Sequence, residues 1–183
     1  MKRFGQALRI GGWVACALLA ARPAAAAEVF GAAAIHDAHV GIAICCFEHG
    51  ADLQAGVRSA PLAGLLGGEL RGQAFGSVNT AGGVDFAAAG LVLRWPLGGR
   101  FYLQPGLGGA VHDGPGQKFQ ATPDRLYLGS RVLFEPEVSL GWRVSSDLAV
   151  EAALIHLSHG RLAGRQNPGL DDVGVRVAYR FGR

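Results

Sequence analysis

Cysteine is scarce in this sequence, and its arrangement argues against the common metal and redox sites. The three cysteines are Cys16, Cys45 and Cys46. None has the C-x-x-C spacing of a zinc or thioredoxin-like motif. Disulfide geometry is demanding, so a bond between adjacent cysteines would be strained, and two thiols near a strand or loop is the simpler interpretation. We therefore expect no metal and no cofactor.

Clustered charge is also missing. The 183 residues carry a formal net charge of +3, and the arginines are spread singly along the chain. A nucleic-acid partner would be expected to meet a basic patch or stripe, so none is predicted. The sequence also lacks a linker, a low-complexity tract and a composition shift, and its length suits one domain.

Long apolar runs are absent apart from one near the N-terminus, residues 10–21. This run is well short of the roughly 20 residues that a membrane-spanning helix needs. Basic residues precede it, Arg22-Pro23 ends it, and four alanines follow at 24–27. This order is typical of a secretory signal peptide rather than a membrane anchor. We expect residues 1–27 to be the signal peptide and 28–183 the mature domain.

A helical period is missing from the mature part, which shows short alternating segments between Gly-, Pro- and Asp-containing breaks. Eight strands are predicted, at residues 29–36, 50–58, 70–79, 84–95, 100–112, 130–143, 147–158 and 172–181. Tight connections alternate with long ones. The pattern predicts an all-β fold, an eight-stranded antiparallel transmembrane β-barrel, with an interior filled by side chains. Pro105 and Pro136 each predict a bulge, because proline removes a ladder donor.

The two faces of the predicted strands differ in polarity. In the last strand Val173, Val175, Val177, Tyr179 and Phe181 alternate with Asp172, Gly174, Arg176, Ala178 and Arg180. A soluble lipocalin-like barrel would turn the apolar face inward. We favour the inverse, with the apolar face toward lipid, because buried charges persist only when paired. The pairing set is Glu135, Glu137 and Glu151 with Arg131, Arg143, Arg176 and Arg180. Trp142 and Tyr179 fall near strand ends, where interfacial aromatics are expected.

Polar residues interrupt the outward face at the long-loop end, within the stretch "LIHLSHGRLAGRQNPGLDDVGV". Residues i and i+2 of a strand lie on one side, about 6.6–7 Å apart, so His156 and Ser158 continue the outer row. Asp171 has the parity of Val173 and begins the neighbouring strand, so the three side chains should meet. A polar strand end at the level of the lipid headgroups would carry such residues without catalysis.

These residue types also suit ester chemistry. A histidine can take the proton of a serine nucleophile, and a carboxylate can hold the histidine in the required tautomer. Asn167, or backbone N–H groups at Gly160 or Gly169, could donate to an oxyanion. Four arginines near the same rim are either contacts for the phosphates of a substrate or ordinary solvated or lumenal charges: Arg125, Arg131, Arg161 and Arg165.

The segment "YLGSRVLFEPEVSLGWRVSSDLAVEAALIHLSHGRLAGRQNPGLDDVGVRVAYRF" resembles the lipid A 3-O-deacylases, the PagL-type outer-membrane hydrolases. The resemblance continues more weakly through "GSVNTAGGVDFAAAGLVLRW" and "LQPGLGGAVHDG". It implies an eight-stranded barrel that removes the ester-linked acyl chain at the 3-position of lipid A without a cofactor.

Carried over residue by residue, the resemblance makes His156 the catalytic base and Ser158 the nucleophile. Asn167 and Gly169 match the downstream Asn and Gly of the family. Asp171 falls on the acidic position, where the founding members have Glu; Asp172 is a substitute, but its parity points inward. His159 replaces an Asn that usually follows the serine, so it would have to donate to an oxyanion through its ring or backbone N–H.

The sequence thus predicts a lipid A 3-O-deacylase in the bacterial outer membrane, acting on lipopolysaccharide through His156, Ser158 and Asp171. A homodimer is left open. The alternative is a structural or adhesive eight-stranded outer-membrane barrel that has the fold without the chemistry.

Overall fold

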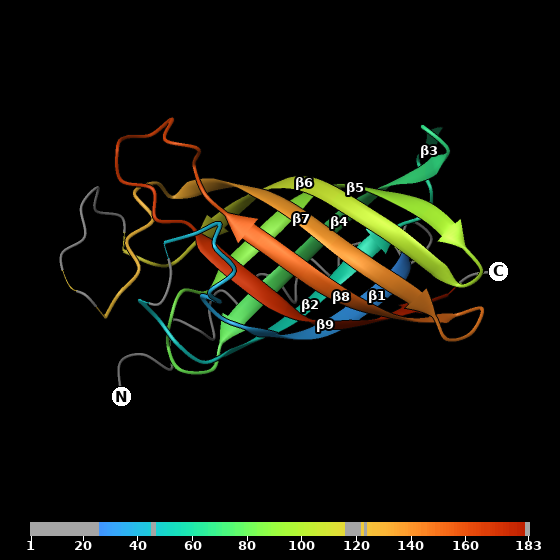
Figure 1. Ribbon diagram of the computed structural model, residues 1–183, viewed down its shortest axis with the longest axis horizontal. Coiled ribbons are helices and arrows are strands. Elements are labelled where there is room, and N and C mark those ends of the chain that lie inside the picture. The colour runs from blue at the N-terminus through green and yellow to red at the C-terminus, as the bar shows by residue number, and fades with distance from the viewer. Residues whose placement is uncertain (1–25, 45–46, 116–121, 123, 182–183) are drawn as a thin grey trace.

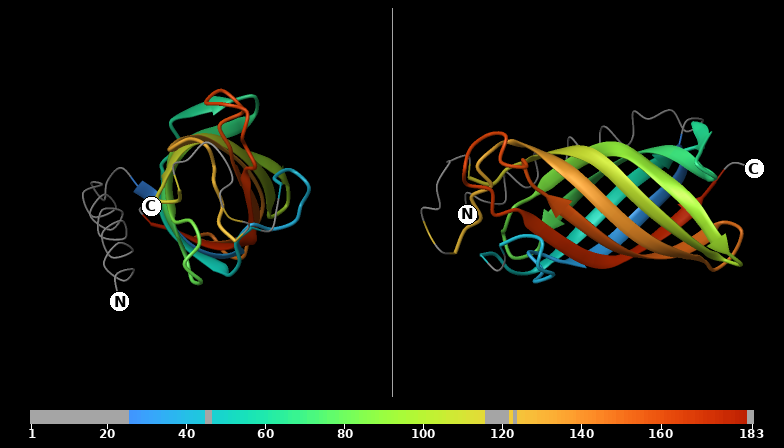
Figure 2. Two further views of the ribbon diagram at one scale, coloured as in Figure 1. Left: turned by 90° about the vertical axis from the view of Figure 1, so that its left-hand side faces the viewer. Right: turned by 45° about the horizontal axis from the view of Figure 1, so that its top comes forward.

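The chain forms a closed antiparallel β-barrel (Figures 1 and 2). This computed structural model describes residues 26–44, 47–115, 122 and 124–181. Around the barrel the strands follow the order β2-β1-β9-β8-β7-β6-β5-β4, and β2 pairs with β4 to close the ring. The strands are β1 (Ala26–Ile35), β2 (Ala51–Ser59), β3 (Ala63–Leu65), β4 (Gly68–Asn79), β5 (Phe86–Gly98), β6 (Phe101–His112), β7 (Val132–Arg143), β8 (Leu148–Leu157) and β9 (Leu170–Arg180).

The eight predicted strands are confirmed, and one short strand is added. β3 pairs with β4 through a tight turn at Leu66 and Gly67, both with positive φ (51° and 81°). Two residues with positive φ are typical of a type I′ hairpin turn. β3 therefore pairs only with β4 and is not a ninth strand of the ring. It lies between the second and third predicted strands, 50–58 and 70–79.

Pro105 and Pro136 do not interrupt the ladder between β6 and β7. These strands keep one register from Phe101↔Trp142 to Val111↔Val132, so the bulges expected at the two prolines are wrong. The signal peptide, residues 1–27, lies almost wholly outside the described residues, as do Cys45 and Cys46, and the peptide stays a prediction. No helix among the described residues has the length and apolar character needed to cross a membrane.

The inverted arrangement of the strand faces is confirmed. In β7 the apolar Phe134, Val138 and Leu140 are exposed, whereas the alternating Glu135 and Glu137 are buried. β9 repeats the pattern, with its valines outside and Arg176 inside. Exposed aromatic residues mark the tight-turn end of the barrel, as expected at a membrane interface; they include Phe101, Trp142 and Tyr179.

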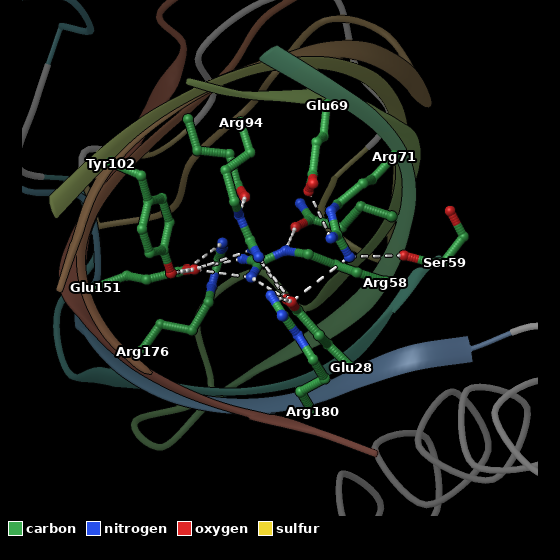
Figure 3. A network of polar contacts seen from close by, with 12 residues as sticks. Glu28, Arg58, Ser59, Glu69, Arg71, Arg94, Tyr102, Glu151, Arg176 and Arg180 are labelled. Atoms are coloured by element: carbon green, nitrogen blue, oxygen red, sulfur yellow. Dashed lines mark hydrogen bonds and ion pairs between the residues drawn. The ribbon is translucent and has the colours of Figure 1, made fainter. Parts of the chain in front are cut away.

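Ion pairs fill the tight-turn half of the lumen (Figure 3). Glu151 accepts two 2.7 Å hydrogen bonds from Arg58 and one from the Tyr102 hydroxyl. Glu28 accepts from Arg94 at 2.6 and 2.9 Å. Every one of these side chains is buried, so each charge depends on its partner.

The predicted lumenal arginines are confirmed only in part. Arg176 is fully buried and contacts Glu137 and Glu151, at 3.2 and 3.4 Å. Arg180 pairs instead with Glu28, at 3.2 Å, and Arg143 lies over the Tyr102 ring. Arg131 is exposed and donates to the backbone of the preceding loop, so its predicted lumenal place is wrong.

An apolar cluster packs in the other half of the lumen, toward the long loops, beside a group of buried polar side chains. The Phe75 ring contacts Phe30 in a tilted arrangement and Phe86 in an edge-to-face arrangement. Leu126 and Leu128 reach down from the long loop between β6 and β7 and are fully buried among them. This packing makes the barrel a solid support, so chemistry has to occur on its surface or at its rim.

Candidate active site

His156 and Ser158 lie at the long-loop end of β8, on the outer side of the barrel. His156 is the penultimate residue of β8, and Ser158 continues it through a bridge to Phe134 of β7. Both are partly exposed, whereas the alternating Leu157 and His159 are buried. Strand alternation therefore places the imidazole and the hydroxyl on one face, next to each other along the strand.

Asp171 lies directly opposite His156 in the β8–β9 ladder. Its Oδ1 lies 2.5 Å from Nδ1 of His156, and the carboxylate has no exposed surface. An acidic acceptor at this distance holds the proton on Nδ1. The other ring nitrogen, Nε2, is then an acceptor, on a side chain that is partly exposed.

The second aspartate serves a different site. Asp172 points into the lumen, where its Oδ2 accepts from Gln54 at 3.3 Å and its Oδ1 lies 3.8 Å from His36. The ladder thus puts Asp171 against His156 and turns Asp172 away from it. One position along a strand decides between an outward and an inward carboxylate.

The loop from Ser158 to Gly169 is held by polar contacts among its own residues. The backbone N–H of His159 donates to Asn167 Oδ1 at 3.0 Å. The His159 ring donates from Nε2 to the Gln166 carbonyl at 2.7 Å and accepts at Nδ1 from the Ala163 N–H at 3.2 Å. His159 thus has its ring and its backbone donor engaged within the loop, while the Asn167 amide still has its NH2 group as a donor.

Gly169 lies between the His156 ring and the loop that joins β1 to β2. Its φ is +79°, and an added Cβ would lie 2.8 Å from Cε1 of His156. A larger residue would therefore displace the imidazole as well as strain the backbone. The predicted Gly160, also at positive φ (57°), is exposed at the turn after Ser158.

The structure also reveals partners that the sequence analysis missed. The backbone N–H of Ala43 donates to Asp171 Oδ2 at 2.8 Å, and that of Ala38 donates to the Asp171 carbonyl at 2.7 Å. Any residue except proline supplies a backbone N–H, so residue types give no signal for such contacts.

The predicted basic residues divide into two groups. Arg161 and Arg165 are exposed and line a surface pocket of about 640 Å³ on the 158–169 loop. Arg125 instead contacts Glu48 at 3.4 Å, and Arg131 donates to the Gly114 carbonyl. Arg161 and Arg165 are thus placed to meet a ligand from outside.

Within the described residues, one cluster of His and acidic side chains is compact enough to hold a metal ion: His36, Asp52 and Asp172. It is buried in the lumen and separate from His156. The His36 ring already contacts Asp52 through Nδ1 at 3.0 Å and Glu48 through Nε2 at 3.2 Å. Burial opposes its charge, but these two hydrogen bonds outweigh burial and raise the His36 pKa to about 10. The arrangement is that of a charged imidazolium between carboxylates.

Comparison with known proteins identifies the family. The sequence profile of the lipid A 3-O-deacylase (PagL) family matches residues 50–180. The chain belongs to this family. It is similar to the crystal structure of the outer membrane enzyme PagL, with 18% identity and a TM-score of 0.61, over 85% of this chain and 100% of that one.

A de novo designed transmembrane β-barrel is also similar, with 12% identity and a TM-score of 0.50, over 85% of this chain and 97% of that one. A comparison with curated protein sequences found no match. The structural likenesses, at such low identity, show the fold. Together with the family, they support an outer-membrane location.

Proposed function

We propose that this protein hydrolyses the ester-linked acyl chain at the 3-position of lipid A. Ser158 is the nucleophile, His156 the general base and Asp171 the carboxylate that orients His156. The observation that carries the proposal is the 2.5 Å contact between His156 and a fully buried Asp171, on the outer face beside a partly exposed serine. Membership of the family supports lipid A as the substrate.

The position of the site fits a lipid substrate. The ester bonds of lipid A lie at the boundary between headgroup and acyl chains. His156 and Ser158 continue an exposed apolar row, which includes Val132 and Phe134 on the neighbouring strand. A substrate in the outer leaflet can therefore reach the serine sideways, without leaving the membrane.

The reaction proceeds by acyl transfer. His156 Nε2 takes the proton of the Ser158 hydroxyl as Oγ attacks the ester carbonyl. The tetrahedral intermediate collapses, the proton passes to the leaving sugar oxygen, and the acyl chain stays on Ser158. Water, deprotonated by the same histidine, then releases the fatty acid. Asp171 stabilises the imidazolium at each step.

We assign the oxyanion contact to Asn167 and not to His159. The His159 N–H donates to the amide oxygen of Asn167, which leaves the NH2 group of Asn167 as the donor. A preorganised donor of this kind is the usual stabiliser of a tetrahedral intermediate. His159, with its ring engaged by Gln166 and Ala163, holds the loop that carries Asn167. Gly169 provides the space for the His156 ring.

Mass spectrometry of lipid A from cells that express the protein tests the proposal. The native chain should remove one hydroxyacyl group, and fragmentation should locate the loss at the 3-position. Ser158→Ala should give unchanged lipid A, because no other group supplies the nucleophile. Ser146→Ala, at an exposed serine in the tight turn between β7 and β8, is the matched control and should behave as the native chain.

Heat-modifiable migration in detergent gels establishes that each variant is a folded barrel. Unchanged lipid A with a folded native barrel would contradict the proposal and favour the structural or adhesive alternative. A mass loss that persists in Ser158→Ala would place the chemistry elsewhere.

A further inference from the structure

The loop between β1 and β2 crosses the start of β9 and lies against the catalytic strand ends. Within residues 38–44 of this loop, three backbone N–H groups donate hydrogen bonds to Pro168 or Asp171. Ala38 donates to the Asp171 carbonyl and Ile44 to the Pro168 carbonyl, each at 2.7 Å. Between them Ala43 donates to Asp171 Oδ2 at 2.8 Å. The segment 38–44 is thus attached at both ends to the backbone around the acid, with Ala43 on the carboxylate.

The path of this loop is fixed at two further points. Asp37, at a φ of 50°, accepts the N–H groups of Phe47 and Glu48 at its Oδ2. The Glu48 carboxylate then enters the lumen and accepts from the N–H groups of Val84 and Leu126, at 2.6 and 3.1 Å. The loop therefore returns to the solid interior of the barrel, which holds Ala43 in place.

We propose that the backbone N–H of Ala43 is a positioning group for the catalytic acid. The Asp171 carboxylate has two oxygens. Oδ1 meets His156, and Oδ2 meets Ala43. A carboxylate held by one bond can rotate about its own axis, whereas two bonds on opposite oxygens fix its plane. The plane of the carboxylate sets the plane of the imidazole, and hence where Nε2 meets the Ser158 proton. This inference rests on the proposed function.

Replacing one backbone amide by an ester gives the sharpest test. L-Lactic acid at position 43 removes the N–H and keeps the methyl side chain. The matched control is the hydroxy-acid analogue of isoleucine at position 42, whose N–H makes no hydrogen bond within the described part of the chain. Activity is measured as fatty acid released from purified lipopolysaccharide by the refolded barrel in detergent micelles.

The ester at 43 should lower kcat by about 10- to 100-fold with little change in KM, as expected for the loss of a hydrogen bond to a charged group. The ester at 42 should leave kcat within about twofold of the native value, because it removes no contact with the acid. In an Asp171→Ala background, the ester at 43 should have no further effect, because coupled residues are not additive.

An ester at 43 with native kcat would overturn the inference, as would an equal loss with and without Asp171. Ala43→Pro, which also removes the N–H, and Ala43→Gly, which keeps it, repeat the comparison in a chain made by ordinary expression. If the proposed function itself were wrong, the result would differ, because Ser158→Ala would then release fatty acid as fast as the native protein.

Discussion

Gly169→Ala is expected to disable the enzyme through His156 while leaving the barrel folded. The added Cβ would lie 2.8 Å from Cε1 of His156, whereas ordinary contact begins at 3.4 Å, so one of the two must move by 3.4 − 2.8 = 0.6 Å. Ala43 Cβ and the Leu157 carbonyl oxygen lie 3.2 and 3.3 Å from the same Cβ. A shift of the new methyl group away from His156 would therefore bring it closer to these atoms. A misplacement of about 1 Å can cost a factor of about 100 in rate, and we expect kcat to fall by about 10- to 100-fold.

Gly82→Ala separates this effect from backbone strain. Gly82 has the same φ of +79°, and nothing lies within 4 Å of its added Cβ. In urea titrations of the micelle-bound barrel, Gly82→Ala should lose about 1–2 kcal/mol of unfolding free energy, the cost of a left-handed alanine, and Gly169→Ala should lose at least as much because its Cβ also has close contacts. Only Gly169→Ala should lose kcat on purified lipopolysaccharide. Equal kcat values for the two variants would refute the reasoning, because strain alone would then explain both.

Two further predictions concern the lumen. Glu151→Leu removes the acceptor shared by Arg58, Tyr102 and Arg176 and should lower the unfolding free energy by about 3–5 kcal/mol. Glu69 is half exposed and has Arg71 as its partner, so Glu69→Leu should cost less than about 1 kcal/mol. Similar losses for the two variants in urea titrations would contradict the distinction between buried and exposed ion pairs. His36, facing Glu48, Asp52 and Asp172, has its pKa raised from 6.5 to about 10 because hydrogen bonds to the carboxylates outweigh burial. The charged His36 therefore stabilises the folded barrel fully below about pH 6.5, and this stabilisation is lost as the pH rises toward about 10. Over that range the urea midpoint should fall more steeply with pH for the native protein than for His36→Gln. Parallel slopes for the two proteins would argue against a charged His36.

Strand positions and faces could be predicted from the sequence because alternation is a local property. β9 shows this clearly, since one register places its valines outside and Arg176 inside. The same alternation puts His156, Ser158 and Asp171 on one side of the sheet from residue order alone. The lumenal partners were harder to predict, because pairing across a barrel depends on strand tilt and stagger. Arg58 and Arg94, which contact Glu151 and Glu28, were not predicted.

The loops limited the prediction most. The short strand β3 depends on a turn at Leu66-Gly67, and leucine gives no signal for positive φ. The roles suggested for His159 could not be narrowed from sequence, because only the folded loop shows its ring between Gln166 and Ala163. The contact from Ala43 to Asp171 joins residues 128 positions apart in the chain, and neither residue type indicates the other.

The closure of the ring has a consequence for the proposed catalytic acid. β1 and β9 are the first and last strands, and their ladder is the seam that joins the two ends of the chain. His156 and Asp171 come from the C-terminal side of that seam, and Ala43 comes from the N-terminal side. His156, Ser158 and Asp171 all belong to the β8–β9 segment and can meet before the ring closes, whereas the contact from Ala43 depends on the seam. Closure of the ring therefore completes the support of the proposed catalytic acid, because a barrel that is still open holds Asp171 by one carboxylate oxygen alone.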